Sequence, residues 1–133
     1  MLMSLADPRW RFVLHMNWRA QTTGFLLGQG LPYNPSSPPP TPSRSQIASI
    51  SPYAQVLAGA YRSPTFLIHG RPDDLIPWQQ SMRTVEALKL RGVEAGIEII
   101  EGARHLFDTF PEVGVDFEPQ VRKGYEWLGR FAQ

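Results

Sequence analysis

Residues 65–77 read TFLIHGRPDDLIP, and residues 97–108 read IEIIEGARHLFD. Each segment begins with a mostly apolar run, which is typical of a buried strand, and continues into a loop that holds a titratable side chain. Asp73 lies in the first loop and His105 lies in the second. Because the functional residues of open α/β sheets gather where the strands end, the two segments predict a site at one edge of a sheet.

The two apolar runs are expected to form strands at Thr65–His69 and Ile97–Glu101. A helix from Trp78 to about Leu90 joins them, and Gly92 follows it, as a glycine commonly follows a last helical turn. A crossover of this length suits parallel strands and not a hairpin. The strands are therefore predicted to be parallel neighbours in an α/β fold.

Two further helices are expected on either side of this unit. Ser51 has the side chain of a helix cap and Pro52 has the fixed φ of a first helical residue, which predicts a short helix that ends near Gly59. A last helix is expected from about Glu118, with Pro119 at its first position. The predicted fold class is α/β, with a partial sheet of two parallel C-terminal strands and flanking helices.

The first third of the chain differs in character from the rest. Residues 1–31 contain aromatic and apolar residues at spacings that suit one or two short helices. Residues 32–45 contain six prolines and four serines, which predicts an extended linker. Such a linker is either a surface loop or a proline-rich ligand for a small recognition domain. Residues 46–133 then form the α/β region.

The composition is that of at most one globular domain. The chain has 133 residues, of which 42% are hydrophobic and 19% are charged. The 13 basic and 12 acidic residues are spread along the chain and leave no electrostatic footprint for nucleic acid or an anionic membrane. Cysteine is absent, which excludes disulfides and cysteine-ligated zinc. With no pattern of a signal peptide or a membrane span, a cytoplasmic location is expected.

An aspartate and a histidine on neighbouring loops can act together as an acid and a base. The carboxylate holds the imidazole in one tautomer and stabilises the imidazolium that forms when the ring takes a proton. Taken alone, Asp73 also fits a turn acid and His105 an ordinary loop histidine. No G-x-S-x-G motif occurs in the chain, and Ser51 and Ser81 stand at helix starts without such an elbow. Neither serine is expected to be a nucleophile, and no cofactor or metal is expected.

The motifs HGxxDxxIP and EGxxHxFD, with Ser-Pro upstream, make residues 51–133 similar to part of a known superfamily. They resemble the last two strand–helix units of the α/β-hydrolases, in the esterase and prolyl-oligopeptidase-like branch. The resemblance implies that Asp73 is the acid and His105 the base of a Ser-His-Asp triad, and that His69 is structural. Residues 1–31 loosely resemble the helical insertion of such enzymes.

The sequence therefore predicts a truncated serine-hydrolase-type protein that carries the acid and base of a triad without the nucleophile. If completed by a serine-bearing part, it would cleave esters or amides of small molecules. The alternative is a catalytically inactive remnant that binds a protein partner, or a second copy, through the open edge of its sheet, since an unpaired edge accepts further strands. Neither interpretation involves nucleic acid, a membrane or a cofactor.

Overall fold

The computed structural model of the chain describes residues 8–18, 22–28, 34, 36, 40–109 and 115–132. The chain divides into two compact units, Met1–Ala54 and Gln55–Gln133. The N-terminal unit begins with the helices α1 and α2, at Pro8–Trp18 and Thr22–Leu26. The rings of Phe12 and Phe25 join these helices in an edge-to-face contact, with centroids 5.7 Å apart. The prediction of one or two short helices before residue 31 is confirmed.

Helix α3, Arg44–Ile50, was not expected from the sequence. Its N-terminus is a capping box, in which the backbone N–H of Gln46 donates to Ser43 Oγ and the N–H of Ser43 donates to Gln46 Oε1. The last two residues of the predicted linker, Arg44 and Ser45, are therefore helical. Most of the proline-rich stretch before residue 40 lies outside the described residues.

Helix α4, Pro52–Leu57, begins where the sequence predicted. The N–H of Ala54 donates to Ser51 Oγ at 3.3 Å, so the serine caps the helix. The chain then turns at Gly59, whose φ of +74° a glycine adopts without strain. The boundary between the two units falls within this helix.

The C-terminal unit is built on a two-stranded parallel sheet. Strand β1 is Thr65–Gly70 and strand β2 is Ala95–Ile100, and their register pairs the first residue of one with the first residue of the other. The prediction of adjacent parallel strands is confirmed. Strand β2 begins two residues earlier and ends one residue earlier than expected. Both strands therefore end level with each other, and the loops that follow leave from the same edge.

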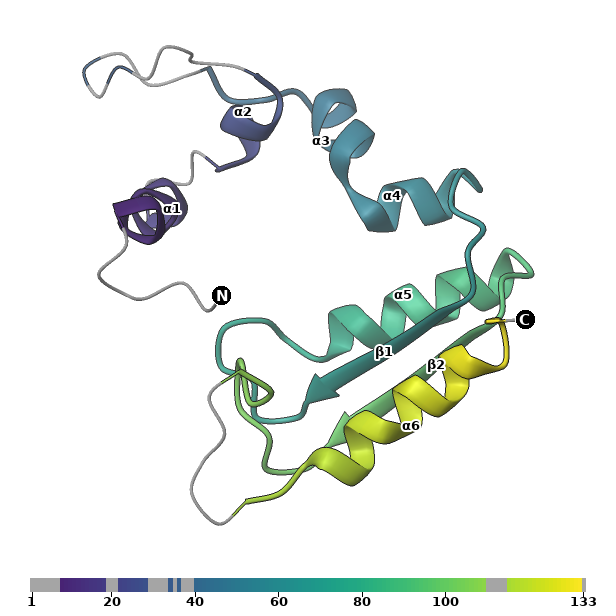
Figure 1. Ribbon diagram of the computed structural model, residues 1–133. Coiled ribbons are helices and arrows are strands. Elements are labelled where there is room, and N and C mark those ends of the chain that lie inside the picture. Colours follow the sequence, from purple (N-terminus) through teal and green to yellow (C-terminus); the bar gives the residue numbers. More distant parts are fainter. Residues whose placement is uncertain are drawn as a thin grey trace. The chain divides into compact units, whose positions relative to one another are not determined.

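Helices α5, Gln79–Leu90, and α6, Glu118–Gly129, cover the two faces of this sheet (Figure 1). Consecutive residues of β1 face different helices. Ile68 Cδ1 lies 2.9 Å from the place where a Cβ on Gly124 of α6 would stand, whereas the next residue, His69, contacts Ser81 of α5. Helix α6 begins at Glu118, so Pro119 is its second residue and not, as the sequence had predicted, its first.

The buried core of the C-terminal unit lies between α4, α5 and β2. It is formed by Val56, Ala87, Leu88 and Val93, with Ala95 packed against it. Leu88 has no exposed surface. Because this core fixes α5 against the sheet, it also fixes the loop that leads from β1 into α5, where Asp73 lies.

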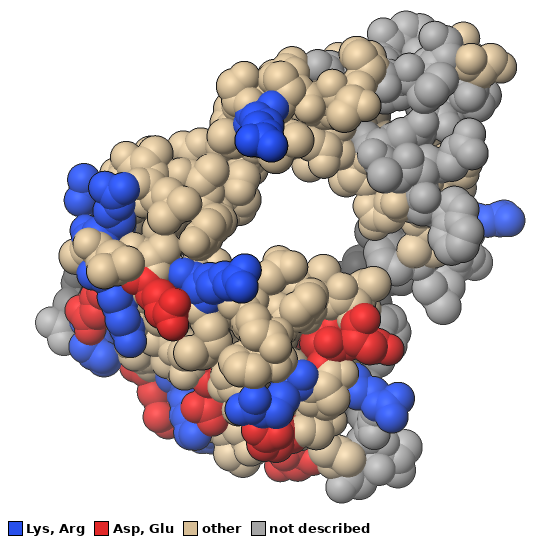
Figure 2. Space-filling model, turned by 180° about the vertical axis from the view of Figure 1, so that it is seen from behind, with Lys and Arg blue, Asp and Glu red and all other residues tan. Residues whose placement is uncertain are grey.

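Charged side chains of both signs interleave over the C-terminal unit on the face that Figure 2 shows. Elsewhere on the unit, one ion pair joins helix α6 to the sheet, between Lys123 and Glu98, and another lies along the helix, between Arg122 and Glu118. Within the described parts of the chain, no helix is long and apolar enough to cross a membrane.

Candidate catalytic site

The loops that follow β1 and β2 are joined to each other at their first residues, before the chain reaches Asp73 or His105. The backbone N–H of Arg71 donates to the carbonyl oxygen of Ile100 at 2.9 Å. The Arg71 side chain pairs with the carboxylate of Glu101, and its guanidinium lies over the ring of Trp78, 4.5 Å from the centroid. The two loops therefore leave the sheet as one connected structure.

Asp73 is held by a turn of its own loop. Its Oδ1 accepts hydrogen bonds from the N–H groups of Leu75 and Ile76, at 2.9 and 2.8 Å. This is the geometry in which an aspartate closes a turn through its side chain. Only 9% of the Asp73 side chain is exposed, so the second oxygen, Oδ2, is directed to partners within the protein.

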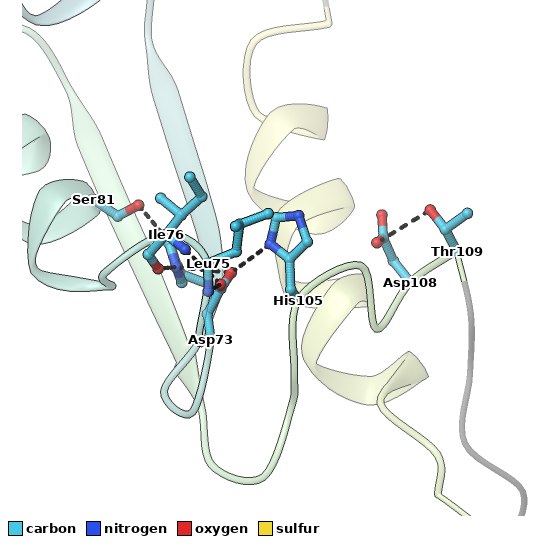
Figure 3. A network of polar contacts seen from close by, with 8 residues as sticks. Asp73, Leu75, Ile76, Ser81, His105, Asp108 and Thr109 are labelled. Carbon is cyan, nitrogen blue, oxygen red and sulfur yellow. Dashed lines mark hydrogen bonds and ion pairs between the residues drawn. The ribbon is translucent and has the colours of Figure 1, made fainter. Parts of the chain in front are cut away.

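The other oxygen of Asp73 faces His105. Oδ2 lies 3.0 Å from Nδ1 of the imidazole, as the dashed line between the two side chains in Figure 3 shows. An ionised carboxylate only accepts, so Nδ1 carries the proton and donates it. The two loops thus bring Asp73 and His105 together at one edge of the sheet. The neutral ring then presents Nε2 as a proton acceptor.

These contacts favour the ionised carboxylate. Burial raises the pKa of Asp73, but the hydrogen bonds from the N–H of Ile76, the His105 ring and the N–H of Leu75, with the charge of the imidazolium, outweigh it. Together they lower the pKa of Asp73 from 3.8 to about 2. The acid therefore stays charged at any pH at which the histidine acts as a base.

A second histidine, His69, lies at the end of β1 beside the same aspartate. Its Nε2 is 2.9 Å from the carbonyl oxygen of Ile76 and 3.4 Å from Oδ2 of Asp73. Its Nδ1 is 2.7 Å from the hydroxyl of Ser81. The backbone hydrogen bond agrees with the structural role that the resemblance implied. Only 11% of the His69 side chain is exposed.

The backbone is strained directly after His105. Leu106 has a φ of 60°, and among the described residues it is the non-glycine residue with a positive φ. A leucine in the left-handed region costs about 1–2 kcal/mol. Such strain persists where surrounding contacts hold it, and it is concentrated at functional sites.

A cavity of about 290 Å³ opens beside the pair. Its apolar lining includes Ile68, Ile76, Leu106, Phe107 and Val121, and its polar lining includes Asp73 and His105. The histidine side chain is 30% exposed, so a group that enters the cavity can reach it. The described residues contain no group of three or more histidine, aspartate or glutamate side chains that could hold a metal ion.

Sequence reasoning identified Asp73 and His105 but missed three features of the site. These are the contact between Ser81 and His69, the pair between Arg71 and Glu101, and the strained residue after the base. The first two join residues that are distant in the sequence, so no local pattern contains them. The third had no signal, because leucine does not favour a positive φ.

The arrangement can serve chemically as a general base with an orienting acid. The carboxylate fixes the proton on Nδ1, and Nε2 is available to take a proton from a hydroxyl that approaches through the cavity. The site has the chemistry to activate a nucleophile, and the charge that forms on the ring is balanced by Asp73.

Comparisons with known proteins identify the family of the chain. The model of the prolyl oligopeptidase family matches residues 13–132 of the chain. A non-reducing polyketide synthase, Preu3, from Preussia isomera is 49% identical over 139 residues, and the match covers 96% of this chain and 5% of that protein. The 5-methylorsellinic acid synthase of Aspergillus terreus is 46% identical over 141 residues, with the same coverage. The chain thus spans about a twentieth of the length of these relatives.

One solved structure has the same fold. It is an esterase from Thermogutta terrifontis, described as propionate-bound, with a TM-score of 0.54 and 23% identity. The superposition covers 65% of this chain and 32% of the esterase. At this identity the similarity shows the fold alone, which is a partial α/β fold with two parallel strands. The family match covers most of the chain, and the chain therefore belongs to the prolyl oligopeptidase family of α/β-hydrolases.

Proposed function

We propose that this chain supplies the acid and the general base of a serine-hydrolase centre. The observation that carries the proposal is the distance of 3.0 Å between Nδ1 of His105 and Oδ2 of Asp73. Membership of a hydrolase family and the cavity beside the ring support it. Asp73 orients the ring, and His105 moves the proton.

The nucleophile is a serine from outside these 133 residues, since the chain contains no G-x-S-x-G. Nε2 of His105 takes the serine proton while the oxygen forms a bond to the acyl carbon of the substrate. The imidazolium then gives that proton to the leaving group as its bond to the acyl carbon breaks. A water molecule, activated by the same ring, hydrolyses the acyl-serine and restores both residues.

The substrate class that we propose is an acyl ester or thioester. Several relatives of the chain are named as polyketide synthases, and polyketides are assembled from acyl units. The apolar lining of the cavity, with Ile76, Leu106 and Phe107 beside the base, suits the acyl part of such a substrate. Amides remain within the chemistry of the centre. We also propose a cytoplasmic location, which the absence of cysteine supports.

A chimera tests the proposal. This chain replaces the 139-residue matching region of the Preussia isomera polyketide synthase, and release of free product is measured. The native chimera is expected to release product, and His105→Ala is expected to slow release by at least about 10³-fold. His15→Ala, in the N-terminal unit, is the control and should release product at the native rate.

The isolated chain gives the complementary result. With a short-chain chromogenic ester, we expect little hydrolysis, because a base without a serine and an oxyanion hole contributes only about 10²–10⁴-fold. In the isolated chain, His105→Ala should lower that small residual rate by no more than this factor. Rapid hydrolysis that depends on His105 in the isolated chain would show that the nucleophile lies within it.

A second candidate function is binding through the sheet edge. A groove of about 250 Å³ runs between β1 and α6, and its lining includes Tyr125 and Leu128, which are 72% and 51% exposed. Exposed apolar side chains beside a strand that is paired on one side favour association with a protein or a second copy. A chimera that releases product equally well with and without His105 would favour this function.

A further inference from the structure

Ser81 lies in the first turn of α5 and contacts the histidine that the proposed mechanism does not use. Its hydroxyl oxygen is 2.7 Å from Nδ1 of His69. The other ring nitrogen, Nε2, faces the carbonyl oxygen of Ile76 at 2.9 Å and Oδ2 of Asp73 at 3.4 Å. Both of these oxygens only accept, so Nε2 carries the proton of the ring. Nδ1 of the neutral ring then accepts a hydrogen bond from the hydroxyl of Ser81.

The backbone of Ile76 is consequently held at both of its polar groups. Its N–H donates to Oδ1 of Asp73, and its carbonyl oxygen accepts from Nε2 of His69. The histidine is itself held by Ser81, which belongs to a helix packed on the core. The turn that carries the acid is therefore connected to α5 through two side chains.

We propose that Ser81 is a positioning residue, which acts through His69 to hold the acid turn so that Asp73 Oδ2 meets His105. The inference rests on the proposed function, because it assigns a supporting role for the same pair. Loss of the hydroxyl leaves Nδ1 of a largely buried ring without its donor, and a buried acceptor without a partner is unfavourable. The ring is then free to move, and the Ile76 carbonyl loses its fixed partner.

The geometry does not make Ser81 a nucleophile. A triad serine contacts Nε2 of its histidine while the aspartate contacts Nδ1. Here the serine is on Nδ1, and the nearest partner of Nε2 is a backbone carbonyl. Among the described residues, the lining of the cavity includes His69 but not Ser81. The hydroxyl thus faces the protein side of the ring and not the substrate side.

The test compares two hydroxyls of the same helix. Ser81→Ala removes the contact with His69, and Thr84→Ala removes a hydroxyl that bonds only its own helix, at the Gln80 carbonyl. Nuclear magnetic resonance of the full chain, which has three histidines, can follow the Nδ1 proton of His105. We expect its exchange with water to be about tenfold faster in Ser81→Ala and unchanged in Thr84→Ala.

Catalysis in the polyketide synthase chimera gives the second measurement. Ser81→Ala should lower kcat for product release about tenfold with KM within twofold, because the acid turn is misplaced while the substrate contacts remain. Ser81→Thr keeps the hydroxyl and should restore both the exchange rate and kcat. Should the alanine variant not fold, Ser81→Cys, which has a similar shape and is a weak donor, takes its place with the same expectation.

The two measurements separate the two proposals. A native chimera that releases no product overturns the proposed function, and the exchange of the His105 proton then decides the role of Ser81 alone. An active chimera in which Ser81→Ala matches Thr84→Ala, in both exchange and kcat, overturns the positioning role and leaves the proposed function standing. A tenfold higher KM for Ser81→Ala with an unchanged kcat would also overturn the positioning role, since that result places Ser81 in substrate binding.

Discussion

Gly70, the last residue of β1, lies directly against the carbonyl group of Ala103 in the loop after β2. A Cβ on this glycine would stand 1.9 Å from the carbonyl oxygen of Ala103, which is backbone and has no side chain to move aside. Ala103 itself is fully buried. The absence of a side chain at Gly70 is thus what lets the acid loop and the base loop approach each other.

Gly70→Ala is therefore expected to destabilise the protein by about 3 kcal/mol or more, because the loops must separate to admit a methyl group. Chemical denaturation measures the change in the free energy of unfolding. Gly129→Ala is the matched control, since a Cβ there meets nothing within 4 Å and the residue ends helix α6. It should be neutral or stabilise by up to about 1 kcal/mol. Equal effects from the two substitutions would contradict the close approach.

The core makes a second prediction, which compares two leucines near the end of α5. Leu88 is fully buried, whereas Leu90 is 85% exposed. Leu88→Ala should destabilise by about 2–5 kcal/mol, because it removes a buried side chain and leaves a cavity. Leu90→Ala should change stability by less than about 0.5 kcal/mol. Thermal or urea unfolding distinguishes them, and a similar loss at both positions would mean that α5 presents another face to the sheet.

The sheet and the closeness of Asp73 and His105 could be predicted from the sequence because both follow from local patterns. Two apolar runs joined by a helical crossover have few arrangements other than parallel neighbours, and parallel strands bring Asp73 and His105 to one edge. Helix α3 was missed although its signal was present, as Ser43 and Gln46 have the spacing of a capping box. The prolines before them masked it.

The remaining features of the site depend on tertiary contacts. The bond between His69 and Ser81 requires α5 to pack under β1, and the pair between Arg71 and Glu101 requires the two loops to leave the sheet together. No sequence pattern marks either contact, because each partner alone is an ordinary surface-type residue. Such contacts become visible only once the strand register is known.

The strained residue after the base gives a third prediction. Leu106 has a φ of 60°, a region that glycine enters freely and alanine does not. Leu106→Gly and Leu106→Ala both remove the side chain, so the difference between them reports the backbone alone. The glycine variant should be the more stable by about 1 kcal/mol, as measured by urea unfolding. An alanine variant at least as stable as the glycine variant would mean that the residue does not adopt the left-handed conformation in solution.

The lowered pKa of Asp73 makes a last prediction, about stability at acid pH. The carboxyl group releases its proton with a pKa of about 2 in the folded protein and near 3.8 when unfolded. Since the folded state binds that proton more weakly, its contribution to stability is present above about pH 4 and is lost as the pH falls through about 2. Asp73→Asn should therefore cost on the order of 1–2 kcal/mol at pH 7 and much less near pH 2. Asp74→Asn, at the exposed neighbour, is the control and should show no such dependence. Urea unfolding of the three proteins across pH 2–7 measures the effect, and a cost of Asp73→Asn that stays constant over this range would contradict the hydrogen bonds that hold the acid.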